Sequence, residues 1–263
     1  MRISVFGLGY VGVVSSACLA KDGHTVVGVD PNLTKVDLIN SGHSPIVESE
    51  VDELVSEAVE NGRLTAITDS LNAVENSDIS LICVGTPSQS NGSLDLSYVR
   101  SVCQEIGTAI AAKPEKHIVI MRSTMLPGSM IDVVLPTLES ASGKTAGEGF
   151  GLAINPEFLR EGPAVYDYRN PPKTVIGCSD EETSDIVANL YSHLPGPVVK
   201  TDLRTAEMVK YVDNVWHALK IGFANEVGNV AKALGIDGHA VMDIFCQDTK
   251  LNLSPYYLKP GFA

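Results

Sequence analysis

Residues 2–12 read RISVFGLGYVG, a short apolar run that ends in three glycines with the spacing GxGxxG. We expect a buried strand at Arg2–Phe6, a tight turn at Gly7 and a helix directly after the turn. In this motif the second glycine, Gly9, lets the backbone approach a pyrophosphate, and the third, Gly12, lets the helix pack closely on the strand. The stretch therefore predicts the first strand–turn–helix unit of a dinucleotide-binding domain.

An acidic residue lies at the position where dinucleotide-binding domains bind the ribose of the cofactor. Asp30 follows the next predicted strand, Thr25–Val29, and lies 18 residues past Gly12. A carboxylate there accepts a hydrogen bond from the ribose 2′-hydroxyl and repels a 2′-phosphate, so the sequence predicts NAD rather than NADP. The alternative is a glycine-rich turn that binds nothing.

Short apolar strands alternate with helical patterns along most of the chain. Further strands are predicted at Ile79–Val84, His117–Met121, Gly151–Ile154, Thr174–Gly177 and Pro197–Lys200. The predicted helices are Val11–Asp22, Leu33–Asn40, Val51–Asn61, Leu96–Ala112, Met130–Ser142 and Glu181–His193. This alternation predicts an α/β fold over residues 1–201, a Rossmann-like, doubly wound and mostly parallel sheet with right-handed crossovers.

The rest of the chain has a purely helical pattern. Residues 205–234 contain no proline and keep apolar side chains in steps of three and four, which predicts one long helix. We expect three apolar residues to form its packed side: Met208, Val212 and Val215. A shorter helix is expected at His239–Cys246, and residues 202–263 are therefore assigned to a second domain.

Composition narrows the class of protein. The chain has 263 residues, a formal net charge of −13 and no Lys/Arg-rich run, so we expect no nucleic-acid-binding face. No apolar run is long enough for a membrane span, and glycines interrupt the apolar start, so neither a membrane anchor nor a secretory signal is expected. The five cysteines form no CxxC pair, which argues against a metal site and favours a reducing, cytoplasmic compartment.

Three further segments follow predicted strands, at the sheet edge where open α/β folds bind ligands. They are VGTP at 84–87, RST at 122–124 and NPEFLREG at 155–162. The hydroxyl residues in the first two could equally be helix caps. Glu157 and Glu161 would share a face if their segment is a helical turn, where paired carboxylates can take different protonation states. The alternative is a solvated helix start.

The long predicted helix carries a polar stripe. Lys210, Asn214 and His217 are separated by four and three residues and share one side. A lysine and an asparagine one turn apart can orient a hydroxyl or stabilise a developing oxyanion through charge-assisted hydrogen bonds. The alternative is a solvated polar face, and a structural role is commoner for a lone histidine.

These motifs, in this order and together with the terminal KPGFA, resemble the nucleotide-sugar 6-dehydrogenases, the UDP-glucose/GDP-mannose dehydrogenase family, over essentially the whole chain. Segments 214–218, 223–235 and 246–257 resemble members that oxidise GDP-mannose more than those that oxidise UDP-glucose. The resemblance implies NAD-dependent, four-electron oxidation of GDP-mannose to GDP-mannuronate, an alginate precursor. It also implies an all-α central dimerisation domain and an intertwined homodimer formed through the long helix.

The motifs and the resemblance together assign individual residues. The cofactor residues are Gly7, Gly9, Tyr10, Val11, Gly12, Asp30, Lys35, Thr86 and Thr124. The resemblance implies that Thr124 positions water, that Glu161 assists hydrolysis with Glu157 as a second carboxylate, and that Lys210 and Asn214 stabilise oxyanions. The substrate residues it implies are Glu161, Lys210, Asn214, His217, Asn225, Tyr256, Tyr257 and Lys259.

The sequence departs from the family at one point that bears on activity. The family nucleophile lies in an FGGSCxPKD segment after the PGFA at which this chain stops, and none of the five cysteines here has that context. We expect these residues to bind NAD without completing a four-electron oxidation, which needs a thioester. The alternatives are a UDP-glucose 6-dehydrogenase, a two-electron β-hydroxyacid dehydrogenase with a similar Lys/Asn helix, and an NAD-binding module without chemistry.

Overall fold

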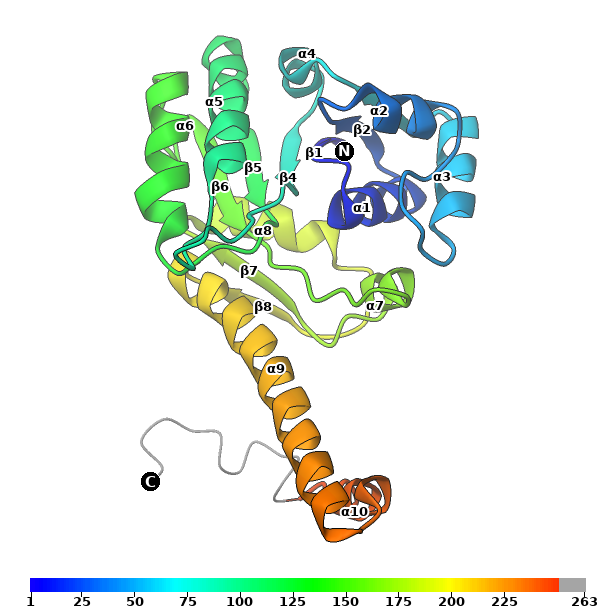
Figure 1. Cartoon of the computed structure of the whole chain (residues 1–263). Coiled ribbons are helices and arrows are strands. Elements are labelled where there is room, and N and C mark those ends of the chain that lie inside the picture. Colours follow the sequence, from blue (N-terminus) through cyan, green and yellow to red (C-terminus); the bar gives the residue numbers. More distant parts are fainter. Residues whose placement is uncertain (251–263) are drawn as a thin grey trace. The chain divides into compact units, whose positions relative to one another are not determined.

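The computed structural model describes residues 1–250 (Figure 1). The chain separates into two compact units, Met1–Tyr211 and Val212–Ala263, and each is described by itself. Helix α9 (Leu203–Leu234) begins in the first unit and continues into the second.

The first unit is built on an eight-stranded sheet with the order β3-β2-β1-β4-β5-β6-β7-β8. The strands are β1 (Arg2–Phe6), β2 (Thr25–Val29), β3 (Leu64–Ile67), β4 (Ile79–Ile82), β5 (His117–Met121), β6 (Phe150–Ile154), β7 (Thr174–Cys178) and β8 (Val198–Thr201). All neighbours pair in parallel except β6 and β7, which are antiparallel. The predicted doubly wound, mostly parallel sheet is confirmed. Its strand order reverses between β1 and β4, the point at which such sheets bind ligands.

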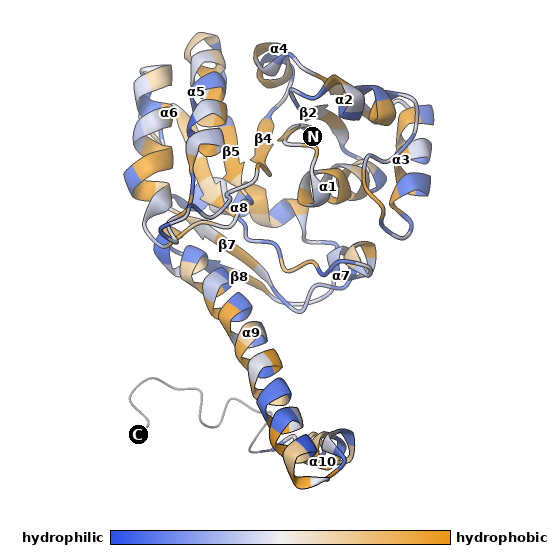
Figure 2. Cartoon of the chain, in the orientation of Figure 1, coloured by the Kyte–Doolittle hydropathy of each residue, from blue (hydrophilic) through white to orange (hydrophobic). Residues whose placement is uncertain are grey.

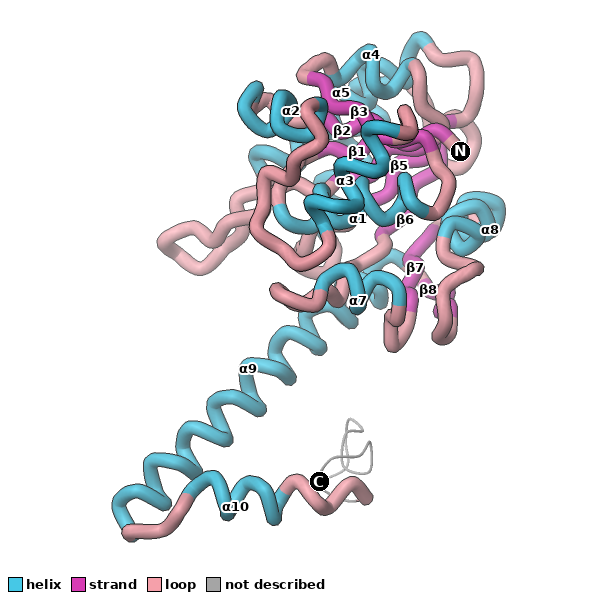
Figure 3. The backbone as a smooth tube through the Cα atoms, turned by 90° about the vertical axis from the view of Figure 1, so that its right-hand side faces the viewer, coloured by secondary structure: helices cyan, strands magenta, loops and turns pink. Residues whose placement is uncertain are grey.

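Helices cover both faces of the sheet (Figures 1 and 3). One hydrophobic cluster packs beneath α1 (Tyr10–Lys21), α2 (Leu33–Asn40), α3 (Val51–Glu60), α7 (Ala164–Arg169) and α8 (Glu181–Leu190). The other packs beneath α4 (Ser70–Glu75), α5 (Ser97–Ala112), the π-helical turn η1 (Met130–Val134), α6 (Leu135–Ser142) and the first turns of α9. Side chains alternate along the strands, so Ile3 and Val5 enter the first cluster and Phe6 the second. Strands β4 and β5 are correspondingly hydrophobic in Figure 2.

The second unit contains the rest of α9 and helix α10 (Gly238–Phe245). Gly235, with φ +68°, follows the last residue of α9 in the left-handed conformation that commonly ends helices. Asp237 caps α10 by accepting hydrogen bonds from the backbone N–H groups of His239 and Ala240. None of the helices described in residues 1–250 has an apolar stretch of membrane-spanning length.

The predicted packed side of the long helix is wrong. Met208, Val212 and Val215 are 52%, 52% and 61% exposed. The start of α9 instead packs through Ala206, which lies against Gly177 of β7, where a side-chain Cβ in place of the glycine hydrogen would come within 2.6 Å of the alanine methyl. Small side chains thus allow the close approach, and Leu203 and Val209 add larger apolar side chains to the packed side of this first part of α9.

Candidate active site

The glycine turn after β1 has the geometry of a phosphate-binding turn. Gly7 has φ +95°, and a Cβ on Gly12 would come within 1.8 Å of the Gly7 carbonyl oxygen, so both positions require glycine. A Cβ on Gly9 would meet nothing within 4 Å. Gly9 is also the N-cap of α1, and no side chain caps the first N–H groups of this helix. Such a terminus favours an anion.

Asp30 lies at the end of β2 and is 5% exposed. Its Oδ2 accepts hydrogen bonds from the Leu8 N–H at 2.8 Å and from Lys35 Nζ at 3.1 Å, and its Oδ1 accepts one from the Asn32 N–H at 2.9 Å. Because a carboxylate offers about four lone-pair positions, one remains for a ribose hydroxyl. The structure therefore brings together the two predicted cofactor residues Asp30 and Lys35.

A cavity of about 470 Å³ opens beside these groups. Gly7, Gly9, Asp30 and Lys35 line it, together with Val84 and neighbouring residues of the loop after β4. Its volume lies within the range of small-molecule and cofactor sites. The open glycine turn, the buried acceptor and the cavity fit the adenosine and pyrophosphate part of a dinucleotide.

The loops after β4 and β5 are joined at the carboxyl edge of the sheet. The Thr86 hydroxyl donates to the backbone carbonyl oxygen of Thr124 at 2.7 Å, and the Ser123 hydroxyl donates to that of Val84 at 2.6 Å. The two predicted threonines therefore lie side by side, each fixed by the neighbouring loop.

A buried ion pair lies next to this edge. Lys210 Nζ on α9 is 2.9 Å from Glu157 Oε1 in the loop after β6, and the two side chains are 10% and 12% exposed. Glu157 Oε2 accepts from the Leu159 N–H at 2.7 Å, and Lys210 Nζ also lies 5.5 Å from the centre of the Phe158 ring. An ion pair with so little solvent is costly to bury, and this one lies at the edge of the sheet where open α/β folds bind ligands.

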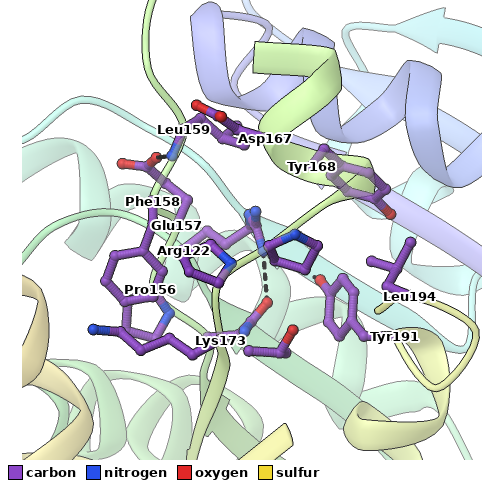
Figure 4. A pocket seen from close by; sticks show the side chains of 14 residues that line it. Arg122, Pro156, Glu157, Phe158, Leu159, Asp167, Tyr168, Lys173, Tyr191 and Leu194 are labelled. Atoms are coloured by element: carbon purple, nitrogen blue, oxygen red, sulfur yellow. Dashed lines mark hydrogen bonds between the residues drawn. The ribbon is translucent and has the colours of Figure 1, made fainter. Parts of the chain in front are cut away.

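Arg122 supports the loop after β6 from the interior of the protein (Figure 4). The sequence did not predict this role. It is 6% exposed, and its Nη1 donates to Asn155 Oδ1 at 2.6 Å and to the Tyr191 hydroxyl at 3.2 Å. The Asn155 amide in turn donates to the Val175 carbonyl oxygen at 2.8 Å. These contacts, beside a small cavity of about 40 Å³, fix the first residue of the NPEFLREG segment.

The helical turn considered for Glu157 and Glu161 is wrong. Residues 155–162 form an irregular loop, so the two carboxylates do not share a helix face, and Glu161 is exposed. Proline at 156 and the ion pair of Arg160 with Asp167, 2.6 Å apart, favour this conformation. The hydrogen bond from Arg160 also lowers the pKa of Asp167.

Tyr10, a predicted cofactor residue in the first turn of α1, is linked to the same loop. Its hydroxyl donates to Glu48 Oε2 at 2.5 Å. Glu48 also accepts from the N–H groups of Gly162 at 2.8 Å and Ala164 at 3.2 Å. Although desolvation opposes it, these hydrogen bonds hold the pKa of Glu48 below its ordinary value. Sequence reasoning missed Glu48 because it lies in an irregular segment and its partners are distant in sequence.

For the remaining predicted residues the structure gives a position only. Val11 follows Tyr10 in the first turn of α1. Asn214, His217 and Asn225 are located on the part of α9 that belongs to the second unit. The last three substrate residues lie outside the described residues: Tyr256, Tyr257 and Lys259.

The cysteines were not assigned a role, and the structure describes them as free thiols. Burial raises the pKa of Cys18, Cys83 and Cys103 to about 12, so these thiols stay protonated at neutral pH. Within residues 1–250, no group of three or more His, Cys, Asp or Glu side chains is arranged to hold a metal ion.

Comparison with known proteins gives a consistent result. The NAD binding domain of the UDP-glucose/GDP-mannose dehydrogenase family matches residues 1–195, and the central domain of that family matches residues 204–263. GDP-mannose 6-dehydrogenase of Pseudomonas aeruginosa is 56% identical over 263 residues, 100% of this chain and 60% of that protein. UDP-glucose 6-dehydrogenase of Haloferax volcanii is 38% identical over 256 residues, 95% of this chain and 59% of that protein.

A solved structure agrees closely with the fold. The crystal structure of a ternary complex of GDP-mannose dehydrogenase from Pseudomonas aeruginosa matches with a TM-score of 0.99 and 56% identity. The match covers 100% of this chain and 60% of that one. The chain thus spans about 60% of the length of the relatives it matches.

Proposed function

Since the chain belongs to the UDP-glucose/GDP-mannose dehydrogenase family, we propose that it is the NAD-binding part of a GDP-mannose 6-dehydrogenase, with a portion of the substrate site. The proposed reaction converts the C6 alcohol of GDP-mannose to a carboxylate and gives GDP-mannuronate. The observation that carries the proposal is the buried Lys210–Glu157 pair at the carboxyl edge of an NAD-binding sheet. The identity of 56% to a GDP-mannose enzyme, against 38% to a UDP-glucose enzyme, favours GDP-mannose as the substrate.

The proposed roles follow from charge and position. NAD, when bound, accepts two electrons and a proton from the C6 carbon in each of two oxidations. Lys210 supplies the positive charge that stabilises negative charge on the C6 oxygen, and Asn214, one helical turn later in sequence, adds a neutral donor. Glu157 fixes the Lys210 ammonium group, while Glu161 and Thr124 would position the water that hydrolyses the thioester on the cysteine of the family's FGGSCxPKD segment and releases the thiol.

We propose that the second unit serves substrate binding and assembly. His217, Asn225, Tyr256, Tyr257 and Lys259 are assigned to the nucleotide sugar. Exposed apolar side chains on α9 support a homodimer formed through this helix: Val215, Leu219, Ile221, Phe223 and Val230 are 48–63% exposed. We place the domain boundary at residues 201/202, between the two family matches, and a cytoplasmic location is consistent with five free thiols.

The experiment is a turnover assay on the product of the native gene, with NADH formation recorded for GDP-mannose, UDP-glucose and a small β-hydroxyacid. The proposal expects two NADH for each GDP-mannose and little turnover of the other two. Oxidation of UDP-glucose or the hydroxyacid in preference would refute the substrate assignment. NAD binding without oxidation of any of the three would support a binding module instead. The 263-residue chain by itself is expected to bind NAD and to show no sustained turnover.

A further inference from the structure

The cavity at the glycine turn includes a carboxylate to which the proposed function gives no role. Besides Gly7, Gly9 and Asp30, the cavity is lined by residues of α4 and α5, among them Glu105. Helices α4 and α5 pack against each other, so this part of the cavity has rigid walls. A carboxylate repels the phosphates of a dinucleotide, so a second acidic residue beside Asp30 in this cavity calls for a favourable contact of its own.

The Glu105 carboxylate is oriented by hydroxyl groups from both helices. The Ser70 hydroxyl, at the start of α4, donates to Glu105 Oε2 at 2.5 Å, and the Ser101 hydroxyl, one turn earlier on α5, donates to Oε1 at 3.4 Å. These bonds use two of about four lone-pair positions. In the described part of the chain no lysine or arginine lies within 4.0 Å of it. The carboxylate therefore keeps accepting capacity for a hydrogen-bond donor in the cavity.

The residues that line the rest of the cavity indicate which ligand group would donate to Glu105. The phosphates belong at the glycine turn and the ribose at Asp30, so the base of the adenosine lies in the remaining part of the cavity. Val84, Val102 and Tyr98 provide apolar surface there for the faces of a ring. Adenine has one exocyclic donor, its 6-amino group, whereas a 6-oxopurine presents an acceptor at the same position.

We propose that Glu105 accepts a hydrogen bond from the 6-amino group of the adenine of NAD and thereby selects adenine over 6-oxopurines. This inference rests on NAD binding by the domain and adds a residue that determines specificity for the base. An oxo group facing the partly buried carboxylate would place two acceptors opposite each other with no proton between them, and the hydrogen bond that the amino group makes would be lost.

The test compares NAD with nicotinamide hypoxanthine dinucleotide, in which the 6-amino group is replaced by an oxo group, by calorimetric titration of the 263-residue chain. The wild type is expected to bind NAD at least about tenfold more tightly than the hypoxanthine analogue. Glu105→Gln replaces an acceptor pair by one acceptor and one donor, so the ratio of the two dissociation constants should fall to about threefold or less. Glu60→Gln is the matched control, since Glu60 is exposed on α3, accepts from the Ser56 hydroxyl and lies outside the cavity.

The outcomes separate this inference from the cofactor assignment. Equal affinity of the wild type for the two dinucleotides would overturn the role of Glu105 while leaving NAD binding intact. An unchanged ratio in Glu105→Gln, or an equal change in the Glu60→Gln control, would overturn it as well. If neither dinucleotide binds the wild type, the cofactor assignment fails and this inference fails with it. The wild-type ratio remains decisive even if the Glu105→Gln variant does not fold.

Discussion

Variants of the buried Lys210–Glu157 pair can test its contribution to stability separately from its proposed role in catalysis. Its N···O distance is 2.9 Å and its side chains are 10% and 12% exposed. At an effective dielectric constant of about 20, Coulomb attraction at this distance is about 6 kcal/mol, and desolvation of the two ions offsets most of it. Lys210→Met leaves the carboxylate unpaired and Glu157→Gln leaves the ammonium group unpaired, so each single change should destabilise the protein by about 3–5 kcal/mol.

The double variant, Lys210→Met with Glu157→Gln, should recover most of this loss and lie within about 2 kcal/mol of the wild type, because no charge remains buried. Urea unfolding of the four proteins, followed by far-UV circular dichroism, measures the cycle. If the loss of unfolding free energy in the double variant equals the sum of the two single losses to within about 0.5 kcal/mol, the two residues are not coupled and the reasoning is refuted. In the complete enzyme, the proposal also expects the double variant to regain stability but not turnover. Recovered turnover would mean that the pair is structural.

Three further predictions concern the cofactor turn and the start of α9. Gly12→Ala should destabilise the protein or abolish NAD binding, since its Cβ would lie 1.8 Å from a carbonyl oxygen, whereas Gly9→Ala should fold normally and lose NAD affinity in calorimetry. Asp30→Ser should weaken NAD binding by about tenfold or more and reduce the preference over NADP, measured by the same titration. Glu207, 1% exposed, accepts from the backbone N–H groups of Gly128 at 2.6 Å and Met130 at 2.8 Å, and Glu207→Gln should cost about 1–3 kcal/mol. Burial raises the pKa of the Glu207 carboxyl above its ordinary value of 4.5. The stability that this group contributes is therefore present below pH 4.5 and declines as the pH rises through the raised pKa. Over this pH range, unfolding curves should show that the wild type loses more stability than Glu207→Gln.

The parts of the fold that the sequence predicted are those with strong local signals. Strands β1, β2 and β5 and helix α2 have the predicted bounds, because each is a dense apolar or capped segment between turn residues. Strand β3, Leu64–Ile67, was missed because it is a four-residue edge strand with two of its residues outside the buried core. A local pattern that short does not distinguish a strand from a loop.

Features that depend on distant partners were not accessible from the sequence. The antiparallel direction of β7 is set by its pairing with β6, in which Ile154 lies opposite Gly177, and apolar periodicity carries no information on direction. The same limit applies to the candidate site. Glycine spacing predicted the cofactor turn and Asp30, but the partner of Lys210 and the role of Arg122 arise only when β5, β6 and α9 are brought together.

The hydrogen bonds of Glu48 link the proposed dinucleotide site to the loop that contains Glu157. One carboxylate accepts from Tyr10 at the start of α1 and from Gly162 and Ala164 beyond the substrate loop. Because this carboxylate joins the two segments, we expect a dinucleotide bound at the first turn of α1 to restrict the motion of the loop in which Glu157 lies as well. By thermodynamic reciprocity, a substrate that orders this loop would then raise the affinity for the dinucleotide by the same factor. One carboxylate thus connects the segment proposed to bind the dinucleotide with the loop that carries Glu157.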